Sequence, residues 1–349
     1  MQRTTRNRKE WKSRSFTCSE QQPDKLKEFP QTPGGNGRLT PLLYPFERNF
    51  PKVIWCKYRW WKNRRLNEVL PKLNQRHAWL TVIDRLGAPG DALITANVIR
   101  CLKLKYPNLR INCITPHDEL IKFDPSIESL NSPETFYSFD SSYWELIVRK
   151  EDRENVIAHN LNKLGIKEFT YKSKFFLSSE EKEWAKNKIP RASKPTIAIC
   201  TRSKETVKNW PKEHWESLIE SLRHDYNLIQ IGDDKELVLK HTRSFSGKHT
   251  MRESAALLSQ ANLFIGPDSL LMHIANGLSI KSIIIFGGSR PVDSLGYKDN
   301  TNVSSTPSCS PCWIHDGYEN CVHNIQCMKD IKHETVLDLA TKNLVGTCG

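Results

Sequence analysis

Stretches typical of buried strands alternate with stretches typical of helices from residue 79 onward, and this alternation constrains the fold more than any other feature. The first run holds the strand WLTVID (79–84), the turn GAPGD (87–91), a helix over 92–106 and the strand RINCIT (110–115). The second run holds the strands TIAIC (196–200), NLIQI (227–231), NLFI (262–265) and SIIIF (282–286), separated by helices that begin near Pro211, Arg252 and Ser269. Strands separated by helices form parallel sheets with helices on their faces. The pattern predicts an α/β protein with two Rossmann-like units in tandem.

The same pattern predicts how the chain is divided. Between the two runs the spacing is irregular, and there YWELIV (143–148) predicts a strand while VIAHNLNKLGI (156–166) predicts a helix closed by Gly165. Residues 1–50 are rich in charge, Gln, Pro and Gly, which disfavours a packed core. We expect four segments: a flexible basic tail (1–50), a basic and aromatic segment (51–78), a short N-terminal Rossmann-like domain (79–175) and a C-terminal Rossmann-like domain (176–349).

The positive charge of the chain is concentrated near its N-terminus. The 349 residues carry a formal net charge of +13. The first 80 residues hold 18 of the 52 Lys and Arg but only 6 of the 39 acidic residues, so the remaining body is almost neutral. A nucleic-acid enzyme needs a basic face on its body. We therefore expect no nucleic-acid substrate.

A basic and aromatic stretch, residues 52–65, precedes the first strand. Trp55, Tyr58, Trp60 and Trp61 interleave there with six Lys and Arg. Such a composition predicts peripheral attachment to an anionic membrane, because cations are attracted to anionic headgroups and Trp favours the interface. Binding of nucleic acid by this arm, and docking of Trp60 and Trp61 onto the body, are the alternatives.

The chain shows no apolar run of the length that secretion or membrane spanning requires. Six of its ten cysteines are scattered, and only Cys309, Cys312, Cys321 and Cys327 cluster. Scattered thiols are typical of a reducing compartment. We expect a cytoplasmic protein that can attach to the inner face of the cytoplasmic membrane.

The loops that follow the strands carry the candidate functional residues. Ligands of parallel sheets bind at the carboxyl ends of the strands, so the loops over 85–91, 201–209, 232–236, 266–269 and 287–291 should converge on one cleft. The first loop lacks GxGxxG and a P-loop lysine, which argues against a dinucleotide dehydrogenase and a P-loop enzyme. Its Asp91 fits either a helix cap or a general base.

The loops of the second run contain groups that suit a diphosphate. Thr201, Arg202, Ser203, Lys204 and Lys208 lie between a strand and a helix, where cations and N–H groups hold phosphate or remain solvated. In GPDSLLMHIANGL, Asp268 and Ser269 open a helix, and His273 follows one turn later. Alone, this motif equally fits an N-cap with a hydrogen-bonded histidine.

Taken in order, RLGAPGDALIT, KNWPKEHWESLI, GPDSLLMHIANGL, FGGSRP and the cysteine cluster resemble glycosyltransferase family 9, the heptosyltransferases, over roughly residues 79–340. The resemblance implies a GT-B fold, in which two Rossmann-like domains face each other across a cleft. It also implies inverting transfer of heptose from ADP-heptose, with no metal at the reaction centre.

The resemblance assigns roles residue by residue. Asp91 matches the Asp of the family's Gly-Asp motif and becomes the candidate general base. Lys208 matches the lysine before Trp-Pro and is expected to pair with the donor diphosphate, with Thr201 nearby. Glu236 corresponds to a carboxylate that contacts the nucleoside. Asp268, Ser269 and His273 match the family motif that binds the sugar and phosphates of the donor.

Two departures from the family pattern keep alternatives open. Leu270 stands where the donor motif usually has Gly, and the N-terminal domain is short. The acceptor is expected to be a cell-envelope glycan or glycolipid such as the lipopolysaccharide core, a capsule precursor or an O-antigen precursor. A protein acceptor is the alternative, and so is a catalytically degenerate GT-B protein that acts as a scaffold.

The four clustered cysteines, Cys309, Cys312, Cys321 and Cys327, predict a structural site for Zn or Fe. The spacing C-x2-C followed by two further thiols suits tetrahedral thiolate coordination. The family resemblance points the same way, because autotransporter heptosyltransferases have an iron site of four cysteines at a different spacing. Disulfides or reduced thiols remain the alternatives.

Overall fold

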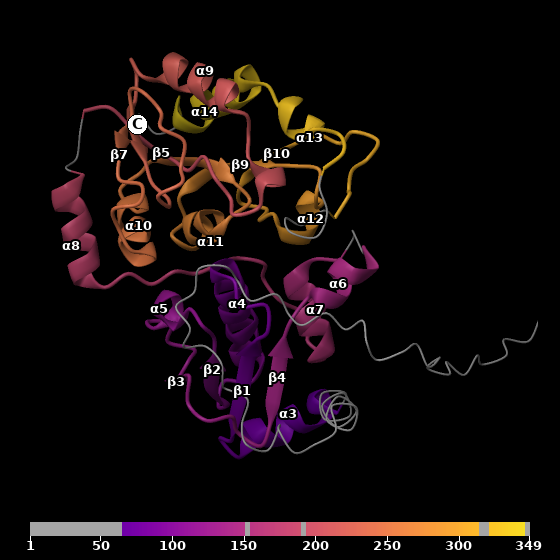
Figure 1. The fold of residues 1–349 in the computed structure, drawn as a ribbon. Coiled ribbons are helices and arrows are strands. Elements are labelled where there is room, and N and C mark those ends of the chain that lie inside the picture. The colour runs from indigo at the N-terminus through magenta and orange to yellow at the C-terminus, as the bar shows by residue number, and fades with distance from the viewer. Residues whose placement is uncertain (1–64, 151–153, 190–192, 314–320, 346–349) are drawn as a thin grey trace, which may run out of the picture. The chain divides into compact units, whose positions relative to one another are not determined.

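The computed structural model describes residues 65–150, 154–189, 193–313 and 321–345 (Figure 1). The predicted tail over 1–50 and the membrane-binding stretch up to residue 64 lie outside the described residues. The described part begins with α3 (Leu66–Gln75), whose Leu66, Leu70 and Leu73 are buried in the core of the first sheet. The proposed segment boundaries remain predictions.

The first sheet has four parallel strands in the order β3-β2-β1-β4. The strands are β1 (Trp79–Asp84), β2 (Arg110–Ile114), β3 (Ser129–Leu130) and β4 (Ser138–Ser141). The helices of this half are α4 (Pro89–Lys105), α5 (Asp118–Ile121), α6 (Trp144–Arg149) and α7 (Val156–Lys163). The chain moves outward from β1 to β3 and then returns to the other side of β1. The switch point of this sheet therefore lies between β1 and β4.

The second sheet has six parallel strands in the order β10-β9-β8-β5-β6-β7. The strands are β5 (Thr196–Ile199), β6 (Asn227–Gln230), β7 (Arg243–Ser244), β8 (Leu263–Pro267), β9 (Lys281–Phe286) and β10 (Thr301–Ser304). The helices are α8 (Ser179–Lys188), the 3-10 turn η2 (Thr206–Lys208), α9 (Lys212–Leu222), α10 (Met251–Leu258), α11 (Leu270–Gly277), α12 (Val292–Leu295), α13 (Gln326–Lys329) and α14 (His333–Val345). Its switch point lies between β5 and β8.

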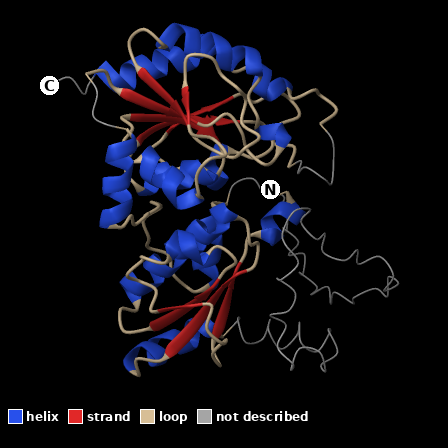
Figure 2. Cartoon of the chain, turned by 60° about the vertical axis from the view of Figure 1, so that its left-hand side comes forward, coloured by secondary structure: helices blue, strands red, loops and turns tan. Residues whose placement is uncertain are grey.

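Successive residues of the central strands of the second sheet face two different cores. Ile283 and Ile285 of β9 pack with residues of α9 and α14, whereas Ile284 and Phe286 pack with residues of α10 and α11. This period of two is what a strand buried on both faces requires. Figure 2 shows the resulting layers, with helices on each side of the second sheet.

Six of the seven strands expected from the sequence are confirmed to within two residues at each end. The strand predicted over 143–148 is wrong, because Trp144–Arg149 forms α6. Tyr143 and Leu146, three residues apart, are buried, while Trp144 and Val148 are exposed. This spacing is helical, so packing decides the conformation in spite of the aromatic and β-branched composition. The helix predicted over 156–166 is confirmed as α7, followed by Gly165 at φ +67°.

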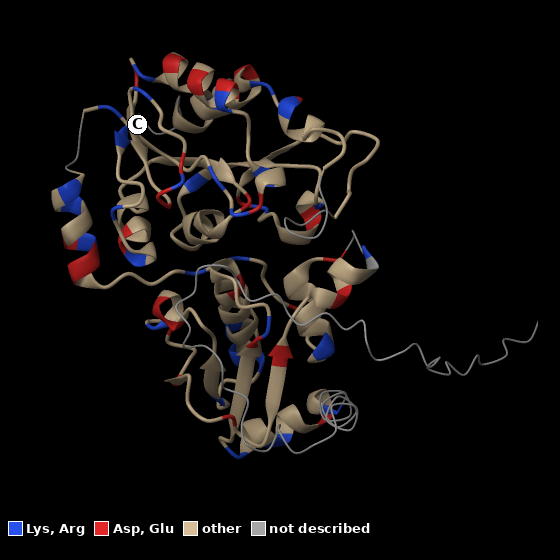
Figure 3. Ribbon diagram, viewed as in Figure 1, with Lys and Arg blue, Asp and Glu red and all other residues tan. Residues whose placement is uncertain are grey.

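Charge is distributed evenly over the described residues. Basic and acidic positions are interspersed along the ribbon of both halves (Figure 3). In the described part of the chain, no helix combines the length and apolarity that crossing a bilayer would require.

Candidate functional site

The loops at the carboxyl ends of the strands surround one cleft of about 530 Å³. As the sequence predicts, all five expected loops contribute to its lining. Asp91 comes from the loop after β1, Lys208 from that after β5, Glu236 from that after β6, Asp268 from the end of β8 and Arg290 from the loop after β9. Residues from both switch points therefore face the same space.

Asp91 is the third residue of α4 and is buried. Its Oδ1 accepts a hydrogen bond of 2.7 Å from the Tyr143 hydroxyl, and its Oδ2 accepts one of 3.2 Å from the Ala88 N–H. The carboxylate thus caps the first turn and also lines the cleft. Burial raises the pKa of Asp91, against the opposing effects of its hydrogen bonds and of the cations Arg290 and Lys208. A raised pKa makes the carboxylate a stronger proton acceptor near neutral pH.

Lys208 lies at the switch point of the second sheet. Its Nζ is 2.9 Å from Oδ2 of Asp268 and 3.3 Å from Oε2 of Glu205. Burial alone would raise the pKa of Asp268, but attraction to Lys208 and Arg290 outweighs it, so the pKa is lowered and the carboxylate stays ionised. A buried cation at the end of a parallel sheet is suited to an anionic ligand such as a diphosphate.

The first turn of α11 begins directly after Asp268. Ser269 lines the cleft, and its buried hydroxyl has no hydrogen-bond partner within the described residues. His273 is buried, and its Nδ1 lies 2.7 Å from the Tyr297 hydroxyl. Burial lowers the pKa of His273 to about 4, assisted by Lys208 and opposed by Asp268. The imidazole is therefore neutral at physiological pH.

Gly90, the residue before Asp91, marks a close approach between α4 and α11. A Cβ built on Gly90 would lie only 3.1 Å from Cδ2 of His273. The contact joins the first half of the molecule to the second at the edge of the cleft. An alanine here would push the imidazole of His273 back by a few tenths of an ångström.

Glu236 lines the end of the cleft beyond β6. Its Oε2 accepts hydrogen bonds from the Thr201 N–H (2.6 Å) and hydroxyl, and the Cys200 thiol donates to its Oε1. Burial raises the pKa of Glu236 to about 7, which the bonds from Thr201 limit. A Cβ on Gly232, at φ +144°, would overlap the Glu236 carboxylate. Thr201 is not among the described residues that line the cleft. It affects the site indirectly, through its hydrogen bonds to Glu236.

Sequence reasoning missed two cleft residues, Tyr143 and Arg290. Tyr143 follows β4, a polar strand (SFDS) with little apolar signal, in the stretch where the prediction failed. Arg290 belongs to the FGGSRP stretch, in a loop that was expected to face the cleft. A cation in that loop was the signal from which its place in the cleft could have been predicted. The Arg290 guanidinium lies 5.8 Å from the centre of the Tyr143 ring.

The cysteine cluster lies apart from the cleft lining within the described residues. Burial raises the pKa of the Cys327 thiol, and the nearby Cys312 and Cys321 raise it further. Cys312 and Cys321 therefore both lie close enough to Cys327 to affect its ionisation. In the described ranges, no group of three or more His, Cys, Asp or Glu is arranged to hold a metal ion.

Comparison with known proteins identifies the family that has this arrangement. The model of glycosyltransferase family 9 (heptosyltransferase) matches residues 138–323, more than half of the chain. The chain belongs to glycosyltransferase family 9. A search of curated proteins finds no match.

Solved structures of glycosyltransferases resemble the chain in fold. The iron-containing dodecameric glycosyltransferase TibC from enterotoxigenic E. coli H10407 is 19% identical, with a TM-score of 0.61 over 77% of this chain and 76% of TibC. The E. coli ADP-heptose lps heptosyltransferase II is 14% identical, with a TM-score of 0.53 over 76% and 98% of the two chains. E. coli heptosyltransferase WaaC, solved with ADP-2-deoxy-2-fluoro heptose, is 11% identical, with a TM-score of 0.53 over 76% and 99%. These similarities confirm the GT-B fold predicted from the sequence.

Proposed function

We propose that this family 9 protein is an inverting glycosyltransferase that transfers heptose from ADP-heptose to a hydroxyl group of a cell-envelope glycan or glycolipid. The observation that carries the proposal is that a proton-accepting group and an anion-binding group face each other across one cleft. A buried carboxylate, Asp91, lies on one side, and a buried cation, Lys208, lies on the other. Structures of TibC with ADP-D-beta-D-heptose and of WaaC with an ADP-heptose analogue support the choice of donor.

In the proposed reaction, Asp91 removes the proton of the acceptor hydroxyl as its oxygen attacks the anomeric carbon of the donor. The bond between that carbon and the diphosphate breaks, and ADP leaves with the bonding electrons. Lys208 and the unpaired hydroxyl of Ser269 stabilise the negative charge that grows on the leaving phosphate. Attack opposite the leaving group inverts the anomeric centre.

Further residues hold the donor in this proposal. Asp268 keeps Lys208 in place, and the neutral His273 presents an imidazole to the sugar and phosphates. Glu236, fixed by Thr201, contacts the nucleoside. None of these steps requires a metal ion, so we expect turnover to be unchanged by added Mg²⁺.

The experiment that tests the donor is thermal unfolding in the presence of ADP, UDP or GDP. A ligand that binds only the folded state raises the unfolding midpoint. We expect ADP alone to raise it, and Lys208→Ala to lose the shift relative to its own unliganded midpoint. Lys212→Ala, which removes an exposed pair with Glu216, is the matched control and should keep the shift.

A scaffold without catalytic activity is the second candidate, and Leu270 is the observation that favours it. Its side chain lines the cleft at the helix that should approach the phosphates. The same unfolding assay separates the candidates, because a degenerate site should give no shift with any nucleotide. A shift with UDP or GDP would keep the transferase and change its donor.

We also propose a structural Zn or Fe ion at Cys309, Cys312, Cys321 and Cys327. Thiolates are suited to either metal, and the influence of Cys312 and Cys321 on the pKa of Cys327 supports their proximity to Cys327. TibC, the iron-containing glycosyltransferase, supports the idea. Metal analysis of the purified protein should find about one ion per chain, and Cys312→Ser should lower this content. Metal-free wild-type protein would exclude the site.

A further inference from the structure

Tyr143 connects the candidate base to the switch point of the first sheet. Asp91 follows β1 and Tyr143 follows β4, and these are the two strands between which the topology reverses. The Tyr143 hydroxyl donates the 2.7 Å hydrogen bond to Oδ1 of Asp91, and both side chains are buried. This hydrogen bond links the segment after β4 directly to the carboxylate of the candidate base, Asp91.

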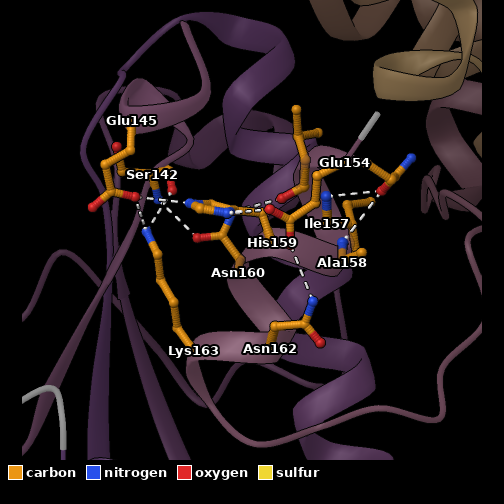
Figure 4. A network of polar contacts seen from close by, with 11 residues as sticks. Ser142, Glu145, Glu154, Ile157, Ala158, His159, Asn160, Asn162 and Lys163 are labelled. Carbon is orange, nitrogen blue, oxygen red and sulfur yellow. Dashed lines mark hydrogen bonds and ion pairs between the residues drawn. The ribbon is translucent and has the colours of Figure 1, made fainter. Parts of the chain in front are cut away.

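The chain on both sides of Tyr143 is fastened to α7 (Figure 4). The Ser142 N–H donates to Oδ1 of the fully buried Asn160 at 2.9 Å, and Nζ of Lys163 donates to the Ser142 carbonyl at 3.2 Å. On the other side, the Glu145 carboxylate lies 2.8 Å from Nε2 of His159 and 2.6 Å from Nζ of Lys163. The phenol is therefore held by a fixed segment of backbone rather than by a mobile loop.

The direction of the hydrogen bond is also fixed. Burial raises the pKa of Tyr143 well above its ordinary value, and the charge of Asp91 raises it further. The phenol thus keeps its proton and donates, while the carboxylate accepts. Arg290, from the loop after β9, faces the Tyr143 ring and opposes this rise in the pKa of Tyr143.

We propose that Tyr143 is a positioning residue that holds the Asp91 carboxylate in one orientation at the cleft. The proposal rests on the proposed role of Asp91 as general base. The two oxygens of Asp91 have different partners, the phenol on Oδ1 and the Ala88 N–H on Oδ2, so rotation of the carboxylate would break both bonds. A donor to the ionised form of Asp91 also favours that form.

The test compares Tyr143→Phe, which removes only the hydroxyl, with Tyr171→Phe. The Tyr171 hydroxyl donates to the Leu295 carbonyl at 2.8 Å and has no contact with Asp91, so it controls for loss of a similar bond. Release of ADP from ADP-heptose is measured from pH 5 to 9 with a lipopolysaccharide-core glycolipid as the acceptor that takes the heptose. For Tyr143→Phe we expect the acid limb to move upward by about one pH unit, so that the rate on this limb falls about tenfold. The rate should recover at high pH, and stabilisation by ADP should stay unchanged.

A wild-type pH profile for Tyr143→Phe would overturn the proposal, as would an equal change in Tyr171→Phe. If the wild-type protein releases no ADP, the proposed function fails, and Tyr143 is then judged by a second readout. Carbon-13 NMR of labelled aspartate follows the titration of the Asp91 carboxyl, assigned with Asp91→Asn. An unchanged Asp91 titration in Tyr143→Phe would overturn the proposal without reference to activity.

Discussion

At the scale of single residues, burial and one or two neighbours decide which charges face the cleft. Lys208 keeps Asp268 ionised despite its burial, whereas His273, buried beside the same cation, is neutral. No cation contributes to the pKa shift of Glu236. Burial therefore dominates and raises its pKa to about 7. The site therefore presents the Lys208–Asp268 ion pair and a neutral imidazole to the region where we place the diphosphate.

The raised pKa of Glu236 predicts a pH dependence of stability. The group titrates near 4.5 in the unfolded chain and near 7 in the folded protein. Unfolded chains lose this proton first as the pH rises, so its contribution to stability is full below pH 4.5 and is lost as the pH rises through 7. Glu236→Gln should flatten this decline, whose size is up to about 3 kcal/mol. Urea unfolding of both proteins between pH 4.5 and 7.5 measures it, and parallel curves would contradict the assignment.

Lys208 and Asp268 should depend on each other for stability. Removing one partner of a buried ion pair leaves an uncompensated charge, so Lys208→Ala should lower the free energy of unfolding by roughly 3 kcal/mol. The double variant Lys208→Ala/Asp268→Asn should recover part of that loss. Chemical denaturation gives the coupling, with Lys212→Ala as an exposed control expected to change stability by less than about 0.5 kcal/mol. Strictly additive losses would show that the pair is not coupled.

At the scale of elements, the sequence predicted those elements that bury both of their faces. β5, β8 and β9 are continuous apolar runs because α9 and α14 cover one face and α10 and α11 cover the other. β4 has only Phe139 as a strongly apolar residue, so it had no such pattern. The helix α6 was mistaken for a strand because its buried stripe, Tyr143 and Leu146, is too short to establish a period.

The contact between α4 and α11 makes a prediction of its own. Gly90→Ala places a methyl group 3.1 Å from Cδ2 of His273, although alanine favours helix more than glycine does. In the wild-type background we expect a lower unfolding midpoint. In the His273→Ala background, where the ring is absent, the same substitution should be neutral or stabilising. Thermal unfolding of the four proteins measures this, and an equal effect in both backgrounds would refute the contact.

At the scale of the whole molecule, the site is assembled from strand ends far apart in the sequence. Residues 91 and 143 of the first sheet meet residues 208, 268 and 290 of the second around one cleft. Asp91, Lys208 and Asp268 could be predicted because they lie in motifs next to predicted strands. Arg290 was missed although its loop was expected to face the cleft, and Tyr143 could not be predicted, because it follows a strand with little apolar signal.

The basic arm belongs to this scale as well. If residues 52–65 attach the protein to membranes, the full chain should sediment with vesicles that contain anionic lipid, and binding should weaken as salt is raised. Deleting residues 1–64 leaves α3 and its buried leucines intact and should abolish this binding. Neutral vesicles are the control. Equal binding of the two chains would exclude the arm as the anchor.

The central claim is that a base and a donor-binding cation act across one cleft. It is tested by measuring release of ADP from ADP-heptose, with a lipopolysaccharide-core glycolipid as acceptor, by the wild-type protein, Asp91→Asn and Lys208→Ala. We expect wild-type release, and a loss of at least about a hundredfold in Asp91→Asn with its stabilisation by ADP retained. Lys208→Ala should lose both release and stabilisation. Release by Asp91→Asn at the wild-type rate would contradict the account.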